Sequence, residues 1–329
     1  MSAAVFSNRW LSPSAWRNLF RDWPLLPLMG LLLVLVIVIQ LADPGIVTLP
    51  WAGVIMRASV PLAILGGCQT LTMLTGGIDL SVASIASMTG FVTATFVHSP
   101  GGWVQGMAIA LVAAALAGFV TGIGVGVFRV HPLIMTLAMS FVVLGFANVW
   151  QLQMVQTGAG VPGELRWVGS NTLFDVIPYS LLVFVPLTLL ILLGLRRTGF
   201  GRLLFAIGDN PIAARLSGAR SWQVLIALYV LSAVLAGIAG LVISGFTNTA
   251  SVSLADPYLL PSVAAAVIGG TSIMGGRGGF SGTIVGALIL TVLTALLTVL
   301  GLPEPTRQIV FGSIIVVVAA AYTRVTSES

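Results

Sequence analysis

The 329-residue chain contains no lysine, a single cysteine and few charged residues. Because all fourteen basic residues are arginines, the chain has no Walker A lysine, Schiff-base lysine or Ser–Lys dyad. Any ATP hydrolysis must therefore take place on another chain. Cys68 lies in an apolar run and has no second cysteine to pair with, so we expect a small buried residue, with neither a disulfide nor a metal site.

Catalytic motifs are missing as well. The predicted membrane helices contain no HExxH, no GxSxG and no pair of carboxylates, which argues against an intramembrane enzyme. The glycine-rich stretch 268–282 matches neither GxxxxGK[ST] nor GxGxxG. Acidic residues are scarce in the apolar segments, which argues against a proton-coupled carrier, because such carriers use them as relays.

The composition indicates a multi-pass membrane protein. Hydrophobic residues make up 57% of the chain and charged residues 7%, and the mean hydropathy is +1.09. These values lie well outside the range of soluble domains. The net charge of +5 is not concentrated in a basic run with interleaved aromatic residues, so we expect contact with membrane lipid and no nucleic-acid partner.

The first apolar segment is predicted to be a membrane helix rather than a cleavable signal. Arg9, Arg17 and Arg21 precede the run 25–42, which would be about 27 Å long as a helix, close to a hydrocarbon core of about 30 Å. A signal-peptide core is shorter and is followed by small residues that the sequence LADPG does not supply. We therefore expect a cytoplasmic N-terminus.

Hydropathy predicts an all-α bundle of about ten membrane helices. The expected spans are 25–42, 51–75, 82–97, 103–127, 132–152, 176–195, 223–246, 258–275, 279–300 and 306–322. The domain boundaries follow: a cytoplasmic segment 1–24, a membrane domain 25–322 and a cytoplasmic tail 323–329. Eight spans fit if the segments that glycines interrupt are re-entrant.

The arginines agree with this topology. Alternating sides from a cytoplasmic N-terminus places eleven of the fourteen on the cytoplasmic side, as the positive-inside rule requires. Only Arg166 and Arg307 fall outside, and Arg57 falls within a span. An arginine inside the bilayer needs a partner or water. Asp79 is the acidic candidate in the same half of the chain, and a snorkelling Arg57 is the alternative.

The loop 196–222 is the longest polar interruption and contains five arginines. Asp209 and Asn210 are good N-cap residues, Pro211 suits the first helical position, and Gly218 suits the position after a helix end. These signals predict a short capped helix outside the membrane. Such a helix is either a connector on the arginine-rich side or a docking element for a soluble partner.

Small residues spaced four apart predict close helix packing on several spans. Gly118, Gly122 and Gly126 share one face of the segment 103–127, and Ala236 and Gly240 share one face of the segment 223–246. Small residues allow helices to approach closely inside a membrane. We interpret these faces as packing surfaces rather than ligand sites.

Two glycine-rich breaks interrupt the apolar segments. The first, 75–81, places two glycines before Asp79 and Ser81, and the second is the stretch 268–282. Asp79 or Ser81 could cap the following helix in a tight turn. Alternatively, the break is a discontinuous helix beside a transport path, where irregular backbone is tolerated. The predicted path residues are Gly76, Gly77, Asp79, Ser81, Gly269, Gly270 and Thr271.

Three stretches resemble the signature regions of the permease subunits of bacterial ATP-binding cassette (ABC) sugar importers. These are GGIDLSVAS at Gly76–Ser84, FGRLLFAIGDNPIAARLSGA at Phe200–Ala219, and the glycine-rich stretch at Asp256–Ala287. The resemblance extends from the second predicted helix onward and is greatest to the ribose, xylose, galactose and autoinducer-2 type. Branched-chain amino acid permeases are relatives, but their motif differs from GGIDLS, which favours a sugar.

The resemblance implies a bundle similar to type II ABC importers in a bacterial inner membrane, with both termini in the cytoplasm. It implies three partners: a second permease copy or paralogue, a cytoplasmic ABC ATPase and a periplasmic sugar-binding protein. The chain itself would hold no cofactor, because ATP and Mg²⁺ bind to the ATPase. The short loop helix would dock in that ATPase. The coupling residues implied are Gly208, Asp209, Asn210, Ala213, Ala214, Arg215 and Gly218.

The expected function is therefore that of a non-enzymatic permease for a monosaccharide, either a pentose or a hexose. Alternative cargoes are autoinducer-2 and a sugar alcohol. An ATP-independent carrier or channel is the alternative from a different class. The scarcity of membrane-buried acids and the capped loop helix argue against it.

Overall fold

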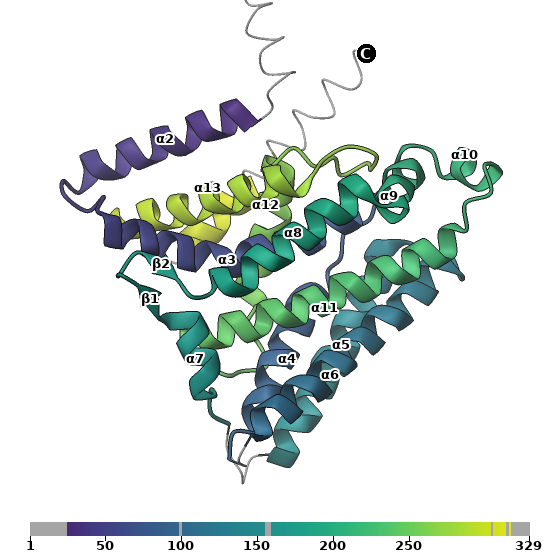
Figure 1. Cartoon of the computed structure of the whole chain (residues 1–329), viewed down its shortest axis with the longest axis horizontal. Coiled ribbons are helices and arrows are strands. Elements are labelled where there is room, and N and C mark those ends of the chain that lie inside the picture. The colour runs from purple at the N-terminus through teal and green to yellow at the C-terminus, as the bar shows by residue number, and fades with distance from the viewer. Residues whose placement is uncertain (1–24, 99–100, 155–158, 304, 314–315, 317–329) are drawn as a thin grey trace, which may run out of the picture.

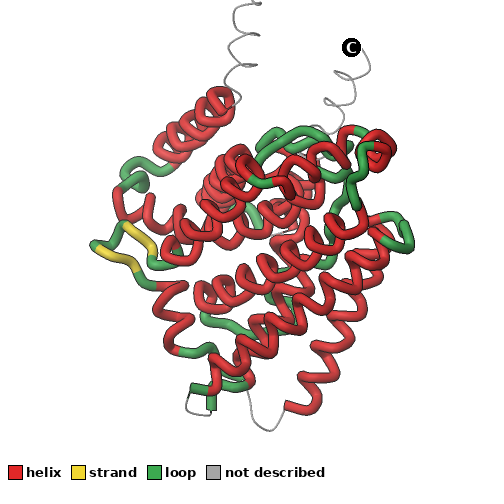
Figure 2. Tube along the Cα trace, turned by 45° about the vertical axis from the view of Figure 1, so that its right-hand side comes forward, coloured by secondary structure: helices red, strands yellow, loops and turns green. Residues whose placement is uncertain are grey.

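The computed structural model describes residues 25–98, 101–154, 159–303, 305–313 and 316, and it shows a helix bundle (Figures 1 and 2). The elements in chain order are α2 Leu25–Ala42, α3 Leu49–Met73, α4 Val82–Thr95, α5 Gly102–Gly126, α6 Pro132–Met154, α7 Gly163–Ser170, β1 Thr172–Leu173, β2 Ile177–Pro178, α8 Leu181–Arg197, α9 Gly199–Asp209, α10 Pro211–Leu216, α11 Ser221–Thr247, η2 Asp256–Tyr258, α12 Leu259–Ile268 and α13 Phe280–Val299. Residues 305–313 are also helical. β1 and β2 form an antiparallel pair, with Thr172 opposite Pro178.

The predicted all-α class is confirmed, but the count of about ten membrane helices is not. In the described part of the chain, six helices are long and apolar enough to cross a membrane, or seven if α8 and α9, bent by 68°, form one span. At 14 and 10 residues, α4 and α12 are about 21 Å and 15 Å long, shorter than a hydrocarbon core of about 30 Å. α12 ends at Ile268 instead of the expected position 275, because glycines follow it.

Three sequence predictions fall wholly or partly outside the described residues. These are the cytoplasmic segment 1–24, the tail 323–329 and, within the predicted helix 306–322, residues 314–315 and 317–322. The other nine predicted spans each contain a helix at the expected place. α2 ends at Ala42, as predicted.

α11 is the central helix and packs against α3, α4, α5 and α7. Small residues allow these approaches, as the four-residue spacing predicted. A Cβ on Gly118 of α5 would collide with the Tyr229 carbonyl of α11, and a Cβ on Gly240 of α11 would collide with the Ala86 carbonyl of α4. α11 also contributes fully buried side chains such as Leu228 and Tyr229. The core is therefore held by backbone approach as well as by side-chain packing.

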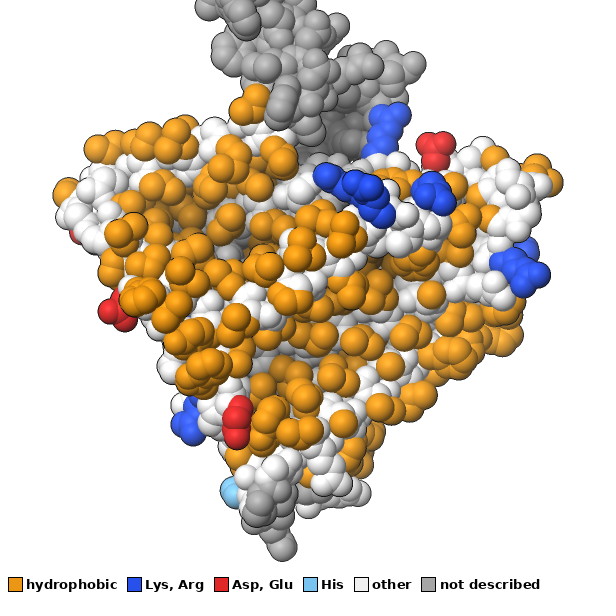
Figure 3. All heavy atoms as spheres, viewed as in Figure 1, with side chains coloured by type: hydrophobic (Ala, Val, Ile, Leu, Met, Phe, Trp, Pro, Cys, Tyr) orange, Lys and Arg blue, Asp and Glu red, His pale blue; other side chains and the backbone are white. Residues whose placement is uncertain are grey.

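The outside of the bundle is apolar. Figure 3 shows hydrophobic side chains over most of one face, with charged side chains near its edges. α2 lies at the periphery and buries only Ile39 among its 18 residues, while Leu33 and Leu41 are exposed. An exposed surface of this kind is stable in hydrocarbon and not in water. The fold is therefore that of a multi-pass membrane protein.

Gly240→Ala is expected to destabilise the bundle, because the new methyl group has to push α4 away from α11. Overpacking of this kind costs about 1–3 kcal/mol. Gly145→Ala on α6 is the matched control, since a Cβ there meets no atom of the described residues within 4 Å. Thermal unfolding in detergent, followed by size-exclusion chromatography, should give a lower midpoint for Gly240→Ala only. Equal midpoints for the two variants would contradict this packing account.

Candidate coupling site and buried polar network

The polar loop 196–222 contains two helices, of which sequence reasoning found one. α9 was expected to be loop. The side chain of Thr198 caps it by accepting a hydrogen bond from the Gly201 amide at 3.2 Å. Its buried residues Gly201, Leu204 and Ile207 recur every three positions. This helical spacing was the signal that could have revealed α9.

α10 is the short capped helix that the sequence predicted. The side-chain oxygen of Asn210 accepts hydrogen bonds from the amides of Ile212 and Ala213, at 3.0 Å and 2.9 Å. Pro211 occupies the first turn. Asn210 is therefore the N-cap, whereas Asp209 is the last residue of α9.

Gly218 ends α10 in the predicted way. Its φ of +83° belongs to the left-handed region, which glycine tolerates without a steric cost. The Gly218 amide donates to the Arg215 carbonyl at 3.0 Å, and the Ala219 amide donates to the Ala214 carbonyl at 3.1 Å. These two bonds form a Schellman motif, which satisfies the last carbonyls of the helix. α10 is therefore defined at both ends by its own local hydrogen bonds.

The exposed face of α10 carries apolar side chains. Ile212 is 62% exposed and Leu216 is 84% exposed, while Ala214 is buried on the opposite face. The side chains of Ile212 and Leu216 therefore do not pack into the core of this chain. They give α10 a surface that an apolar groove on a partner would complement.

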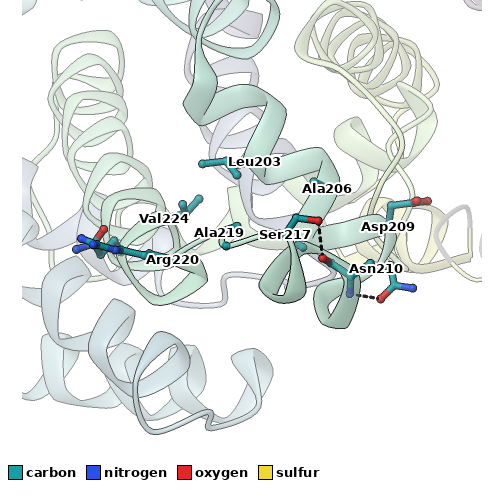
Figure 4. Close-up of a pocket in the computed structure, with 12 residues that line it drawn as sticks. Leu203, Ala206, Asp209, Asn210, Ser217, Ala219, Arg220 and Val224 are labelled. Carbon is teal, nitrogen blue, oxygen red and sulfur yellow. Dashed lines mark hydrogen bonds between the residues drawn. The ribbon is translucent and has the colours of Figure 1, made fainter.

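α9, α10 and the start of α11 line an open cavity of about 680 Å³ (Figure 4). Five of the seven predicted coupling residues line this cavity: Asp209, Asn210, Ala213, Ala214 and Gly218. The other two lie elsewhere. The Arg215 side chain donates a hydrogen bond to the Pro211 carbonyl at 3.0 Å. Gly208, near the end of α9, packs against the Leu74 carbonyl.

The α10 region and the α7 region lie at opposite ends of the bundle, as Figure 1 shows. α11 joins the two ends. It begins at Ser221, shortly after α10, and Gly245 near its other end contacts Gly169 of α7. With 27 residues, α11 is about 40 Å long, enough to cross a bilayer. A partner that docks on α10 therefore approaches the side of the membrane opposite to α7.

In the first glycine-rich break, Asp79 is the centre of a buried hydrogen-bond network. One carboxyl oxygen accepts from the Ser81 amide at 3.0 Å and from the Ser81 hydroxyl at 2.6 Å. The other accepts from the Ser232 hydroxyl of α11 at 2.9 Å. Asp79 and Ser81 are both 1% exposed. The carboxyl group therefore holds the turn before α4 and ties it to α11.

Two further side chains hold the same turn. Gln69 of α3 donates from its amide nitrogen to the Asp79 carbonyl at 2.7 Å and accepts from the Asp79 amide at 3.2 Å. Thr136 of α6 accepts from the Leu80 amide at 3.1 Å and donates to the Ile78 carbonyl at 3.2 Å. Buried backbone groups outside a helix need such partners inside a membrane. The break is thus fixed from three neighbouring helices.

Arg57 does not pair with Asp79, which was the acidic candidate from the sequence. Its guanidinium donates to the Ser170 carbonyl at the end of α7 and lies 5.7 Å from the ring centroid of Phe246. These contacts place Arg57 toward the α7 end of the bundle. A carbonyl and an aromatic ring, rather than a carboxylate, therefore supply its partners.

The second break brings two of the predicted path residues to a smaller cavity. Gly269 and Gly270 line a space of about 320 Å³ together with Arg196 of α8 and Ser281 of α13. Thr271 is 3% exposed, and its hydroxyl has no hydrogen-bond partner among the described residues.

A third cavity, of about 680 Å³, opens among α3, α12 and α13 and is lined by apolar side chains and threonines. None of the predicted path residues lines this third cavity.

Comparison with known proteins identifies the family. Residues 52–319 match the family described as "branched-chain amino acid transport system / permease component". The chain belongs to this permease family. The match begins within α3 and continues through α13, including both glycine-rich breaks and the α9–α10 region.

Several relatives of this permease are named as importers of sugars. The ribose import permease protein RbsC of Escherichia coli K12 is 34% identical over 286 residues, which cover 86% of this chain and 89% of the relative. The fructose import permease protein FrcC of Rhizobium meliloti is 31% identical, covering 81% of this chain and 76% of the relative. The galactofuranose transporter permease protein YtfT of E. coli K12 is 31% identical, covering 80% and 77%. No solved structure matches the chain.

Ser232→Ala is expected to cost more stability than Ser84→Ala, because it leaves one oxygen of the fully buried Asp79 carboxyl without its donor. A buried polar atom left without a partner costs about 1–3 kcal/mol. Ser84→Ala is the control, since Ser84 is part-buried and its hydroxyl lies 2.8 Å from the Ser140 hydroxyl. Denaturant unfolding in mixed micelles measures both variants. A larger loss for Ser84→Ala would show that the Asp79 network does not hold the turn.

Proposed function

We propose that this chain is the membrane permease subunit of an ABC importer that brings a monosaccharide into a bacterial cell. Family membership and the sugar-import names of the relatives support the cargo class. The observation that carries the ATP-driven mechanism is α10, a helix capped at both ends whose apolar side chains Ile212 and Leu216 are exposed.

In this proposal, α10 docks in an apolar groove of a cytoplasmic ABC ATPase. Ile212 and Leu216 would enter the groove, and Ala213 is small enough to permit close backbone approach. Asp209, Asn210 and Arg215 surround this face with polar groups. ATP and Mg²⁺ would bind to the ATPase, because the lysine-free permease has no Walker A residue to hold a phosphate.

The orientation proposed is that α10 and both termini face the cytoplasm and α7 faces the periplasm. The arginines near the two ends support it, since the segment 196–222 around α9 and α10 contains five of them, whereas Arg166 is the one arginine in the segment 159–178 around α7. A periplasmic sugar-binding protein would then deliver the cargo at the α7 end. The translocation path would form between this permease and a second copy or paralogue in the inner membrane.

Within this assembly, transport would follow from a two-state bundle. Closure of the ATPase on ATP would pull on α10 and favour one of two arrangements of the helices, outward-open or inward-open. The glycine-rich breaks at Gly76–Gly77 and at Gly269–Thr271 are the proposed points of irregular backbone beside the path. Among the described residues, no charged side chain lines the third cavity, which suits a path that holds a neutral sugar weakly.

The docking role is tested with two matched substitutions. Leu216→Asp places a charge on the exposed face of α10, and Phe174→Asp does the same between β1 and β2; the two side chains are 84% and 83% exposed. We expect Leu216→Asp to reduce ATPase co-purification and ATP-driven uptake by about tenfold or more. Phe174→Asp should retain ATPase co-purification. Wild-type co-purification in Leu216→Asp would exclude α10 as the docking element.

A further inference from the structure

Three segments that lie far apart in the sequence meet at the C-terminal end of α9. They are the end of α3 with the turn after it, the last residues of α9, and the loop between α12 and α13. Each contributes glycine at the contact: Gly76, Gly208, and the pair Gly275 and Gly276. We call these four residues the glycine junction. They come from the three stretches that carry the family resemblance.

The junction is built from backbone atoms alone. The Gly276 amide donates to the Leu74 carbonyl at 3.0 Å, which joins the α12–α13 loop to the end of α3. A Cβ on Gly208 would overlap these same two atoms. Gly208 therefore lies directly over the hydrogen bond between the two loops, and only a hydrogen atom fits in the space.

The neighbouring contacts have the same character. A Cβ on Gly275 would lie 2.9 Å from the Gly208 carbonyl oxygen and 3.0 Å from the Gly76 nitrogen. A Cβ on Gly276 would lie 3.0 Å from the Asp209 Cα. Gly275 and Gly276 have φ of +93° and +71°, and Gly76 has +77°. Glycine is thus required here both by close approach and by backbone conformation.

Contacts of this kind transmit displacement with little loss. A side chain between two segments can change rotamer and absorb a shift, whereas two backbones in contact cannot. α10 begins immediately after Asn210, two residues beyond Gly208, so little chain separates the proposed docking helix from the junction. A displacement of α10 is therefore passed to Gly208 almost directly.

Hydrogen bonds fix both loops of the junction, which are the turn after Gly76 and the loop between α12 and α13. The turn after Gly76 is fixed by the Asp79 network that reaches α11. The second loop is closed by the Ser272 amide, which donates to the Arg277 carbonyl at 2.9 Å, and by the Gly275 amide, which donates to the Ser272 carbonyl at 3.2 Å. Each loop would therefore move as a unit if pushed at the junction.

We infer that the glycine junction couples the docking helix to both glycine-rich breaks, so that α9, α10 and the two loops move as one body during transport. This inference rests on the proposed function, since it assigns α10 as the ATPase contact. Gly208 is a positioning residue in this scheme. It touches neither sugar nor nucleotide and acts through the backbones of Leu74 and Gly276.

A cross-link tests whether the α9–α10 segment and the loop between α12 and α13 move together. In a Cys68→Ser background, which removes the only cysteine, Asp209→Cys and Arg277→Cys place two exposed thiols beside the contact of Asp209 with Gly276. A short bis-maleimide joins them in the assembled complex. We expect ATP-driven uptake by the cross-linked complex to equal that of the same variant before cross-linking. Loss of uptake only when both cysteines are joined would show that α9 slides over the loop, and would overturn the inference.

Enlarging the junction should uncouple transport from hydrolysis. Gly208→Ala forces apart the Leu74 and Gly276 backbones. Gly194→Ala on α8 is the matched control, because a Cβ there meets no atom within 4 Å in the described part of the chain. For Gly208→Ala we expect the ATPase to remain bound and the sugar transported per ATP hydrolysed to fall by about tenfold. An unchanged ratio would overturn the inference. If Gly208→Ala cannot be recovered folded, the cross-linking result decides.

These outcomes separate the two proposals. If α10 is not the docking element, the Leu216→Asp variant still purifies with its ATPase. If the junction does not couple, Leu216→Asp releases the ATPase as proposed, while cross-linking or Gly208→Ala gives the contrary result above.

Discussion

Helices inside a bilayer must attract one another without a hydrophobic driving force, since lipid tails are as apolar as leucine. In this permease, close backbone approach meets that constraint. Gly118 and Gly240 bring α5 and α4 against α11 so tightly that a methyl group would collide with a backbone carbonyl. The central position of α11, and hence the placement of both ends of the molecule, depends on these approaches.

The same constraint explains why the irregular parts of the backbone are so fully bonded. Where the chain leaves helical geometry around Asp79, no bulk water is available to satisfy its amides and carbonyls. Gln69 and Thr136 supply partners for the backbone from two helices, and Ser232 of a third helix donates to the Asp79 carboxyl. These hydrogen bonds hold the turn in one arrangement relative to its neighbours. A rigid turn of this kind can be displaced as a unit by a partner outside the membrane.

Features set by local sequence were predictable, and those set by tertiary contacts were not. Asn210, Pro211 and Gly218 define α10 through their own backbone preferences, so the cap signals sufficed. Hydropathy is also a local property of the sequence, and it located the long helices. It could not show that α4 and α12 are too short to cross the membrane alone. The Arg57 partners and the meeting of Gly208 with Gly276 join residues far apart in sequence, which no local pattern specifies.

The most direct measurement of ATP-driven import uses proteoliposomes that contain the permease purified together with its companion chains. Labelled monosaccharides, presented with the sugar-binding protein on the α7 side, are tested with and without ATP on the α10 side. The account predicts accumulation of one sugar only when ATP is present and hydrolysed. Equal uptake without ATP, by the permease alone, would contradict it and identify a carrier or channel instead.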